Sequence, residues 1–484
     1  MLDNIEQIVN RLKNETNDLT DIIYRKKIVQ KKNIYIIYNE PLTSSDKISD
    51  FIVRSLNHIE QEKIKTSNIL ERIENDISNF KVKRIQNYNQ VCFYLHRGFT
   101  IILVEKEKEA LALETKANIA RGINPPETES TVRGAKDAFV EDYQINLGLI
   151  KKRIKTNDLW IEGLTIGRYT ATQVGVLSIH GIVEEDLVNQ VMTQLKQIDI
   201  DGIIDSGMIK NLIEKETKSI FPTIITTERP DIVSKALLNG KVAIVVDNSP
   251  YILIVPGLLN DYFKTMEDVY GKGMNITFTR IIKFLAFIIA LFTPAVYIAL
   301  ITYNQEMIPT DLLADFATQR DGVPFPAFFE GVIMIISFEI LRESDLRVPS
   351  FSGSALSIVG ALILGDAAVS AGIVSPIMII VIAITAISSL PFTEYELENA
   401  LRWYRLLFML GGAFLGIVGV LAMTIFFIIR LSNLESFGKP YLMPFAPTDI
   451  DSLKNSIVKF PLKSLNKRPT YLSNNRTMQR RKKR

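Results

Sequence analysis

The chain has 484 residues, 56 Lys and Arg against 53 Asp and Glu, and one cysteine, Cys92. The net charge of +3 excludes a polybasic nucleic-acid-binding protein and an acidic, solvating chain. The single cysteine excludes an intramolecular disulfide framework and a cysteine-rich zinc or iron–sulfur site. The charge is uneven, because the residues from Ser432 onward hold twelve Lys and Arg against three acids. A basic tail therefore follows a mildly acidic body.

Residues 1–118 are expected to form a mixed α/β subdomain. Runs of β-branched and aromatic residues predict strands over 34–38, 91–95 and 100–104. Helical periodicity predicts helices over 48–59 and 67–77. The first thirty residues lack the apolar core of a signal peptide, so we expect this region to stay on the cytosolic side.

A linker is predicted over residues 119–134, where Pro, Gly, Ser and Thr are frequent. The candidate interface residues in it are Pro125, Pro126, Glu127 and Glu129. The prolines restrict the backbone, so the segment is either a rigid spacer or an interface between the parts that it joins. Its composition leaves both interpretations open.

A second mixed α/β subdomain is expected over residues 135–280, beginning with a helix over 135–154. Strands are predicted over 174–179, 242–246 and 251–255, and further helices over 183–197, 206–215 and 231–238. The turn at residues 247–250 predicts a hairpin between the last two strands. The sequence shows no internal repeat.

Charged residues become sparse after Arg280, which predicts an all-α, multi-span membrane domain over 281–430. Full spans are predicted over 281–303, 324–341, 373–390 and 406–429. At about 1.5 Å per residue, the segment 356–369 is too short to cross a hydrocarbon layer of about 30 Å, so we predict a half helix. Four crossings and the basic tail over 431–484 place both termini on the cytosolic side.

Three acidic residues fall within the predicted spans and the half helix, namely Glu330, Glu339 and Asp366. Ionisable groups at membrane depth usually face a bundle interior or water. Glu330 has no local partner, so we expect it to pair across helices or to line an aqueous path. Glu339 precedes Arg342 by three residues, which predicts an ion pair on one helix near the membrane interface.

Small residues are concentrated over 353–372, and such residues let membrane helices approach closely or surround a narrow passage. The candidate pore-lining residues are Val359, Gly360, Leu364 and Gly365. Val359 and Leu364 lie on different faces, so at most one of these two faces the pathway. Simple helix packing is the alternative interpretation.

Catalytic constellations are nearly absent from the sequence. It contains no phosphate-binding Gly-x-x-x-x-Gly-Lys-Ser/Thr loop and no dinucleotide-binding Gly-x-Gly-x-x-Gly motif after a strand. The three histidines, His58, His96 and His180, do not have the spacing of metal ligands. We therefore expect a protein that is not an enzyme and that has no cofactor and no metal.

Four runs resemble the spore germination receptor A-subunit, or GerA, family. They are residues 125–154 (PPETESTVRGAKDAFVEDYQINLGLIKKRI), 227–256 (TERPDIVSKALLNGKVAIVVDNSPYILIVP), 324–350 (PFPAFFEGVIMIISFEILRESDLRVPS) and 360–389 (GALILGDAAVSAGIVSPIMIIVIAITAISS). The resemblance extends from about Ala117 to Arg430. The first hundred residues contribute little to it.

The resemblance implies a nutrient germinant receptor subunit in the inner membrane of bacterial endospores. It implies a transporter-like B subunit that binds the nutrient, a lipoprotein C subunit and a homo-oligomer, with a pentamer as the candidate, that conducts ions in the lipid bilayer. No nucleic-acid partner is expected. A sister group in the family serves the dipicolinate-release apparatus, and the sequence leaves that alternative open.

Two other classes of protein predict different features in the sequence. A secondary transporter predicts internal repeats with paired broken helices, and the sequence has one broken segment. A membrane-anchored enzyme predicts a catalytic constellation before residue 280.

Overall fold

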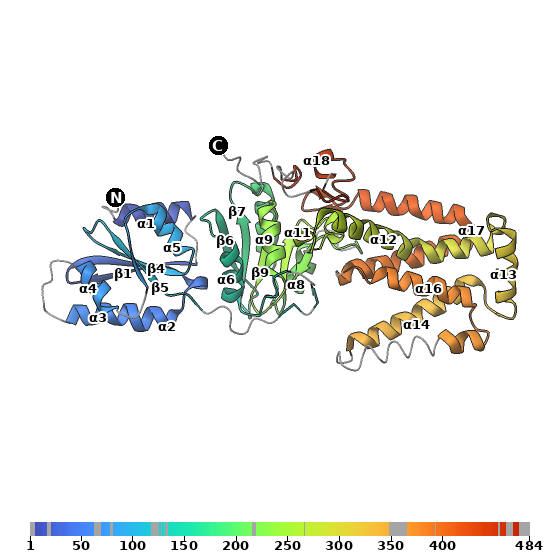
Figure 1. The fold of residues 1–484 in the computed structure, drawn as a ribbon, viewed down its shortest axis with the longest axis horizontal. Coiled ribbons are helices and arrows are strands. Elements are labelled where there is room, and N and C mark those ends of the chain that lie inside the picture. The colour runs from blue at the N-terminus through green and yellow to red at the C-terminus, as the bar shows by residue number, and fades with distance from the viewer. Residues whose placement is uncertain are drawn as a thin grey trace.

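The computed structural model describes residues 5–473, except 17–20, 62–68, 78–80, 118–124, 127, 130, 132–133, 215–218, 266, 348–364, 393, 454 and 461–467. Two α/β subdomains and a bundle of helices follow one another along the longest axis of the molecule (Figure 1). The second subdomain lies between the first subdomain and the bundle. It is therefore the part of the chain that joins the two ends.

The first subdomain is a five-stranded antiparallel sheet in the order β1-β2-β4-β5-β3. Its strands are β1 (Ile22–Val29), β2 (Lys32–Asn39), β3 (Val82–Ile85), β4 (Phe99–Val104) and β5 (Ala110–Glu114). Its helices are α1 (Ile5–Glu15), α2 (Ser45–Lys47), α3 (Arg54–Gln61), α4 (Ile69–Asp76) and α5 (Tyr88–Leu95), with a 3-10 turn at Glu40–Leu42 and a π-helical segment at Ile48–Val53. Helices cover both faces, so alternate residues of β4 enter two separate hydrophobic cores.

The second subdomain is also a five-stranded antiparallel sheet, in the order β6-β7-β9-β10-β8. Its strands are β6 (Leu159–Ile166), β7 (Thr172–Ile179), β8 (Ile225–Thr227), β9 (Val242–Val246) and β10 (Ile252–Val255). Its helices are α6 (Tyr143–Arg153), α7 (Glu185–Lys196), α8 (Ser206–Ile213) and α9 (Pro230–Leu238). The hairpin predicted at residues 247–250 is confirmed, because it joins the paired strands β9 and β10.

The two subdomains repeat one topology. Each has a leading helix, two paired strands, a helical crossover, one strand, one helix and two more strands. In each sheet the third strand of the subdomain lies at the edge, beside the fifth strand. The structure thus contains a repeat that the sequence did not reveal, because the two halves share an arrangement of elements rather than a run of matching residues.

Two elements of the α/β subdomains differ from the sequence-based expectation. Residues 91–95 were predicted as a strand but belong to α5, which Asn87 caps by accepting a hydrogen bond from the backbone N–H of Gln90. Residues 135–142 were predicted as helical, but α6 begins only at Tyr143, after its cap Asp142. Residues 135–142 are held by the turn between β8 and α9, because the backbone N–H of Phe139 donates to the carbonyl of Glu228 at 2.8 Å.

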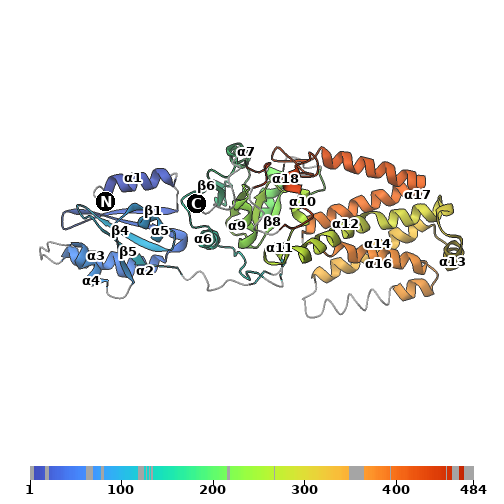
Figure 2. The same cartoon turned by 45° about the horizontal axis from the view of Figure 1, so that its top comes forward.

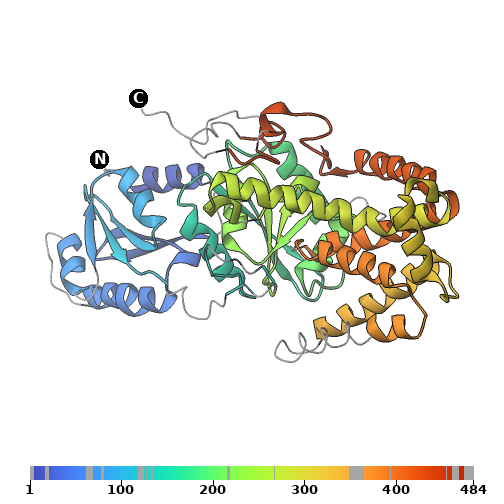
Figure 3. The same ribbon diagram turned by 45° about the vertical axis from the view of Figure 1, so that its right-hand side comes forward.

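The bundle follows the short helices α10 (Leu259–Tyr262) and α11 (Glu267–Tyr270). Its helices are α12 (Gly273–Thr302), α13 (Thr310–Arg320), α14 (Ala327–Arg347), α16 (Pro376–Ser389) and α17 (Tyr395–Ser432), with a 3-10 turn at Gln305–Met307 (Figure 3). Among the described residues, α12 and α17 are long and apolar enough to cross a membrane, and α16 is a shorter apolar helix. Of the predicted half helix over 356–369, only 365–369 are described, and they are helical.

Helix α17 is two helices that meet at Gly416, whose backbone angles of φ 61° and ψ −142° are not helical. The rings of Tyr404 and Phe427 lie 4.9 Å apart. On a straight helix, 23 residues at about 1.5 Å each would separate them by about 35 Å. The chain therefore reverses at Gly416, and its two arms lie side by side (Figure 2). The full span predicted over 406–429 is therefore interrupted at Gly416.

The described part of the basic tail returns to the second subdomain. It contains β11 (Glu435–Ser436), β12 (Lys439–Pro440) and α18 (Ile450–Leu453). The hydroxyl of Ser436 donates to the carbonyl of Thr223 at 2.6 Å and accepts from the N–H of Gly257 at 3.1 Å. The tail is thus packed against the folded body.

We predict a short distance between spin labels placed on the two arms of α17. Trp403→Cys and Ile428→Cys, introduced with Cys92→Ala, put labels at two exposed positions. Neighbouring helices lie about 8–10 Å apart, whereas a straight helix would separate these positions by about 38 Å. Double electron–electron resonance on the full chain in detergent should give a distance much nearer the first value. A distance close to the second would contradict the reversal.

Candidate functional site

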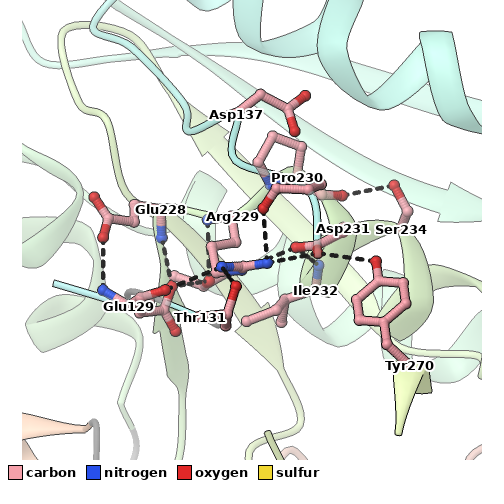
Figure 4. A network of polar contacts seen from close by, with 12 residues as sticks. Glu129, Thr131, Asp137, Glu228, Arg229, Pro230, Asp231, Ile232, Ser234 and Tyr270 are labelled. Carbon is pink, nitrogen blue, oxygen red and sulfur yellow. Dashed lines mark hydrogen bonds and ion pairs between the residues drawn. The ribbon is translucent and has the colours of Figure 1, made fainter. Parts of the chain in front are cut away.

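The most extensive polar network described surrounds Arg229, the cap residue before α9, whose side chain is 1% exposed. All five of its N–H groups have acceptors (Figure 4). Nε and Nη2 bind the two carboxylate oxygens of Asp231 at 3.1 and 2.7 Å. The remaining donors reach the carbonyls of Glu129 and Ala135 and the hydroxyl of Thr131. Arg229 therefore ties the linker to the start of α9.

The linker is held by a second set of bonds from the same turn. A carboxylate oxygen of Glu228 accepts from the N–H and hydroxyl of Thr128 at 2.7 and 2.8 Å and from the N–H of Glu129 at 2.8 Å. In return, the carboxylate of Glu129 accepts from the hydroxyl of Thr227 and the N–H of Glu228. These reciprocal bonds fix the described linker residues against the edge strand β8.

Burial raises the pKa of Glu129 to about 7, although its hydrogen bonds from Thr227 and Glu228 act in the opposite direction. Its carboxyl group is thus poised to change protonation near neutral pH. The linker contact consequently depends on a titratable group.

A buried lysine joins the second subdomain to the start of α17. The ammonium of Lys210 on α8 lies 2.5 Å from a carboxylate oxygen of Glu396 and 3.9 Å from one of Glu394. It also donates to the hydroxyl of Thr226 on β8 at 2.9 Å. Beside it, the ring of Phe221 contacts both arms of α17 and the tail, with centroid distances of 5.3 Å to Tyr404, 5.8 Å to Phe427 and 6.1 Å to Tyr441.

A second buried ion pair joins the start of α12 to α11 and to the tail. Arg280 binds Asp268 at 2.7 Å, and both side chains are 4% exposed. The same guanidinium donates to the carbonyls of Asn455 and Ser456 at 2.8 and 3.2 Å. The two long apolar helices therefore both begin at charged contacts with the soluble part of the chain.

The predicted acid Glu330 lies on α14 and is fully buried. One carboxylate oxygen lies 3.1 Å from Arg320 of α13, and the other accepts from the N–H and hydroxyl of Ser375, each at 2.9 Å. Ser375 is the cap residue of α16. Glu330 thus links α14 to α13 and to the cap of α16, and α13 lies at the end of the bundle away from the soluble subdomains (Figure 1).

The predicted acid Glu339 lies at the other end of α14. It forms an ion pair with Arg342 at 3.2 Å and another with Arg402 of α17 at 2.9 Å. Arg342 in turn contacts Glu398 of α17. This chain of alternating charges joins α14 to the first arm of α17.

The remaining predicted site residues are dispersed. Asp366 is exposed on this chain, whereas Gly365 is buried and lies near Ile379 of α16. Pro125 is exposed and Pro126 is half-buried. Val359, Gly360, Leu364 and Glu127 lie outside the described residues. The expected pore lining over 356–369 thus stays a prediction.

Sequence reasoning missed Lys210, Arg229 and Arg280, although all three are buried cations with carboxylate partners. A signal was present for Arg229, since Glu228, Arg229 and Asp231 surround a proline at the start of a helix. The carboxylate partners of Lys210 come from a distant part of the chain, and Asp268 precedes Arg280 by twelve residues on a separate short helix, so no helical spacing marks either pair.

In the described part of the chain, no group of three or more His, Cys, Asp or Glu side chains could hold a metal ion. His96 contacts Asn157, and His180 stacks on Trp160 with 4.1 Å between ring centroids. Each of these two histidines thus has a contact of its own.

The structure defines a protein with two repeated α/β subdomains and with helices that are able to span a membrane. The buried ion pairs of Lys210 and Arg280, which we call the junction, join these two parts. The chain belongs to the family described as Bacillus/Clostridium GerA spore germination protein, which it matches over residues 10–471. The resemblance seen in the sequence is thereby confirmed.

Several relatives carry names from spore germination. Spore germination protein KA of Bacillus subtilis is 38% identical over 465 residues, which are 95% of this chain and 85% of that protein. Spore germination protein A1 of the same organism is 33% identical, over 96% of this chain and 94% of that protein. A crystal structure of the N-terminal domain of the A subunit of the Bacillus megaterium spore germinant receptor GerK3 is 32% identical, with a TM-score of 0.43 and coverage of 53% of this chain and 96% of that chain.

We predict that Arg229→Ala lowers the free energy of unfolding by about 3–5 kcal/mol, because it leaves the buried carboxylate of Asp231 without its partner. Arg229→Lys should lose much of the same stability, since one ammonium group cannot replace a planar fork with five donors. Thermal unfolding of the full chain in detergent measures both. The matched control is Arg168→Ala, which removes an exposed ion pair with Asp199 and should have little effect. Equal effects of Arg229→Ala and Arg168→Ala would contradict the assignment.

We also predict that Glu129 makes stability depend on pH. Its folded pKa of about 7 lies above the ordinary value of 4.5, so folding favours the protonated carboxyl group. This contribution is complete below about pH 4.5 and is lost as the pH rises through 7. The unfolding temperature should therefore fall less between pH 5 and pH 8 in Glu129→Gln than in the unaltered chain, while the exposed control Glu141→Gln keeps the full decrease. An unchanged decrease in Glu129→Gln would exclude this role.

Proposed function

We propose that this chain is the A subunit of a nutrient germinant receptor of bacterial endospores. It crosses the inner spore membrane several times, with both termini on the cytosolic side, and it assembles with copies of itself into an ion-conducting complex. A transporter-like B subunit binds the nutrient, and a lipoprotein C subunit completes the receptor. Membership in the GerA family is the observation that carries this proposal.

The junction supports a role in transmitting a signal. Lys210 and Arg280 connect the second subdomain and its neighbouring elements to the first residues of α17 and α12. Breaking a buried ion pair costs about 3–5 kcal/mol, so these contacts favour movement of the subdomain and the helices as one body. A change imposed on either part therefore reaches the other.

The buried acids support a role in ion conduction. Burying a carboxylate at membrane depth is energetically unfavourable. The fully buried Glu330 is stabilised by an ion pair with Arg320 and by hydrogen bonds from Ser375. A small displacement of α13 or α16 would break this pairing and expose the carboxylate to a water-filled path. We therefore place the control of ion passage at this end of the bundle.

The alternative within the family is a subunit of the dipicolinate-release apparatus. It shares the family membership, so the two are separated by the order of events in germinating spores. On the proposed role, a receptor subunit is needed for the release of ions after nutrient addition, whereas a dipicolinate-release subunit is needed for the release of dipicolinate alone. A secondary transporter would place its repeats within the membrane domain, and the repeat described here lies in the soluble part.

We predict that Glu330→Gln weakens potassium release from spores after nutrient addition while the protein still accumulates. The substitution keeps the shape of the side chain and removes the charge that Arg320 binds. Potassium flux from liposomes, with the purified chain alone and with its B subunit, measures the same effect directly. Asp311→Asn on α13 is the control, because Asp311 is exposed at the same end of the bundle. Normal release in Glu330→Gln would contradict this role, and delayed dipicolinate release after normal potassium release would favour the sister function.

A further inference from the structure

A cavity of 220 Å³ lies where the second subdomain, the bundle and the tail meet. Its walls come from the linker, from α9, α10 and the first turns of α12, from the residue before α17, and from two segments of the tail. The cavity therefore lies where the second subdomain, the start of the bundle and the tail come together.

The charged side chains that line this cavity are mainly basic. The bases are Lys235, Lys241, Lys264, Arg280 and Arg468, and the acids are Glu129, Asp261 and Glu394. Two of the bases have ion-pair partners, because Lys241 lies 2.6 Å from Asp261 and Arg280 lies 2.7 Å from Asp268. Of the three acids, Asp261 alone has a lowered pKa, because the charges of Lys241 and Lys264 outweigh the opposing effect of burial.

Two lysines at this cavity have no ion-pair partner in the part of the chain that the structure describes. Lys235 and Lys264 are half-buried, and neither forms an ion pair or side-chain hydrogen bond with any residue that the structure describes. Burial, together with the charges of Arg280, Lys235 and Lys241, lowers the pKa of Lys264 to about 8, against the opposing charge of Asp261. A half-buried cation without a counter-ion is costly, so this arrangement favours an anion from outside the chain.

The two other acids do little to neutralise these lysines. Burial raises the pKa of Glu129 to about 7 and that of Glu394 to about 8. Both carboxyl groups are then partly or largely protonated at neutral pH. Burial also lowers the pKa of Lys235, so the positive charge of the cavity rests on its lining, in which five basic residues face three acidic ones.

We propose that this cavity binds a phosphate group, carried by a small phosphate ester or by the headgroup of an anionic phospholipid. A phosphate group carries up to two charges on several oxygens, so it can pair with two ammonium groups at once. A volume of 220 Å³ accommodates such a group and a short attached moiety but not a polymer. Arg280, at the edge of the predicted membrane span, makes a lipid headgroup as accessible a source as a soluble ester.

A phosphate group in this cavity would bind α9, α10 and α12 together. It would stabilise the arrangement that forms the cavity in proportion to its concentration relative to its dissociation constant. Phosphate binding at this cavity does not depend on the nutrient or on ion conduction. Its test, on the purified chain, is therefore independent of the proposed receptor function.

The test measures the unfolding temperature of the full chain in detergent as inorganic phosphate is added, with potassium chloride at the same ionic strength as the reference. Phosphate should raise this temperature more than chloride does. The double variant Lys235→Gln with Lys264→Gln should bind phosphate at least tenfold more weakly, because each charge-assisted contact is worth about 1.5 kcal/mol or more. Lys196→Gln, at an exposed position of α7, should respond like the unaltered chain.

The double variant should fold, because it removes two unpaired cations, and its unfolding temperature without phosphate checks this directly. Each single variant provides the same test if the double variant unfolds. Glycerol phosphate that binds as well as inorganic phosphate identifies a soluble source. Stabilisation by vesicles of phosphatidylcholine with phosphatidic acid, but not by phosphatidylcholine alone, identifies a lipid source. Equal responses to phosphate and chloride, or an undiminished response in the lysine variants, would overturn the proposal.

Discussion

The buried guanidinium of Arg229 is the constraint on which the position of the linker depends. A buried charge is tolerated only when its donors are satisfied, and all five donors of this side chain have acceptors in three separate segments. Asp231 neutralises the charge, while the carbonyls of Glu129 and Ala135 supply partners from the linker and the segment after it. The path of the chain between the two subdomains is therefore fixed by the hydrogen bonds of one side chain, that of the cap residue before α9.

The same physical rule operates at the boundary with the helices. Lys210 and Arg280 are both buried, and each finds its carboxylate partner on a different element. Such pairs contribute little net stability compared with well-packed apolar groups, but breaking one is strongly unfavourable. They therefore define how the subdomain and the helices fit together. The cavity beside them differs, since Lys235 and Lys264 have no partner among the described residues.

The sequence predicted the elements whose signal is local. The strands near residues 34–38 and 242–246 and the apolar helix over 281–303 follow from periodicity and composition, and they are present. Residues 91–95 were misassigned because an apolar run of strand length also suits a short capped helix. The sequence singled out Glu330, which is fully buried in the structure, but its partners Arg320 and Ser375 could not be inferred from local pattern. The repeated topology could not be predicted for the same reason, because local sequence patterns do not reveal the order of strands in a sheet.

The reversal at Gly416 has a mechanical consequence. Both arms of α17 touch the second subdomain near Phe221, which contacts Tyr404 on the outgoing arm and Phe427 on the returning one. Because one ring packs against both arms, a rotation of the second subdomain would tilt the two arms together. The end of the hairpin beside Tyr303 and Asn304 lies farthest from this contact and would move most.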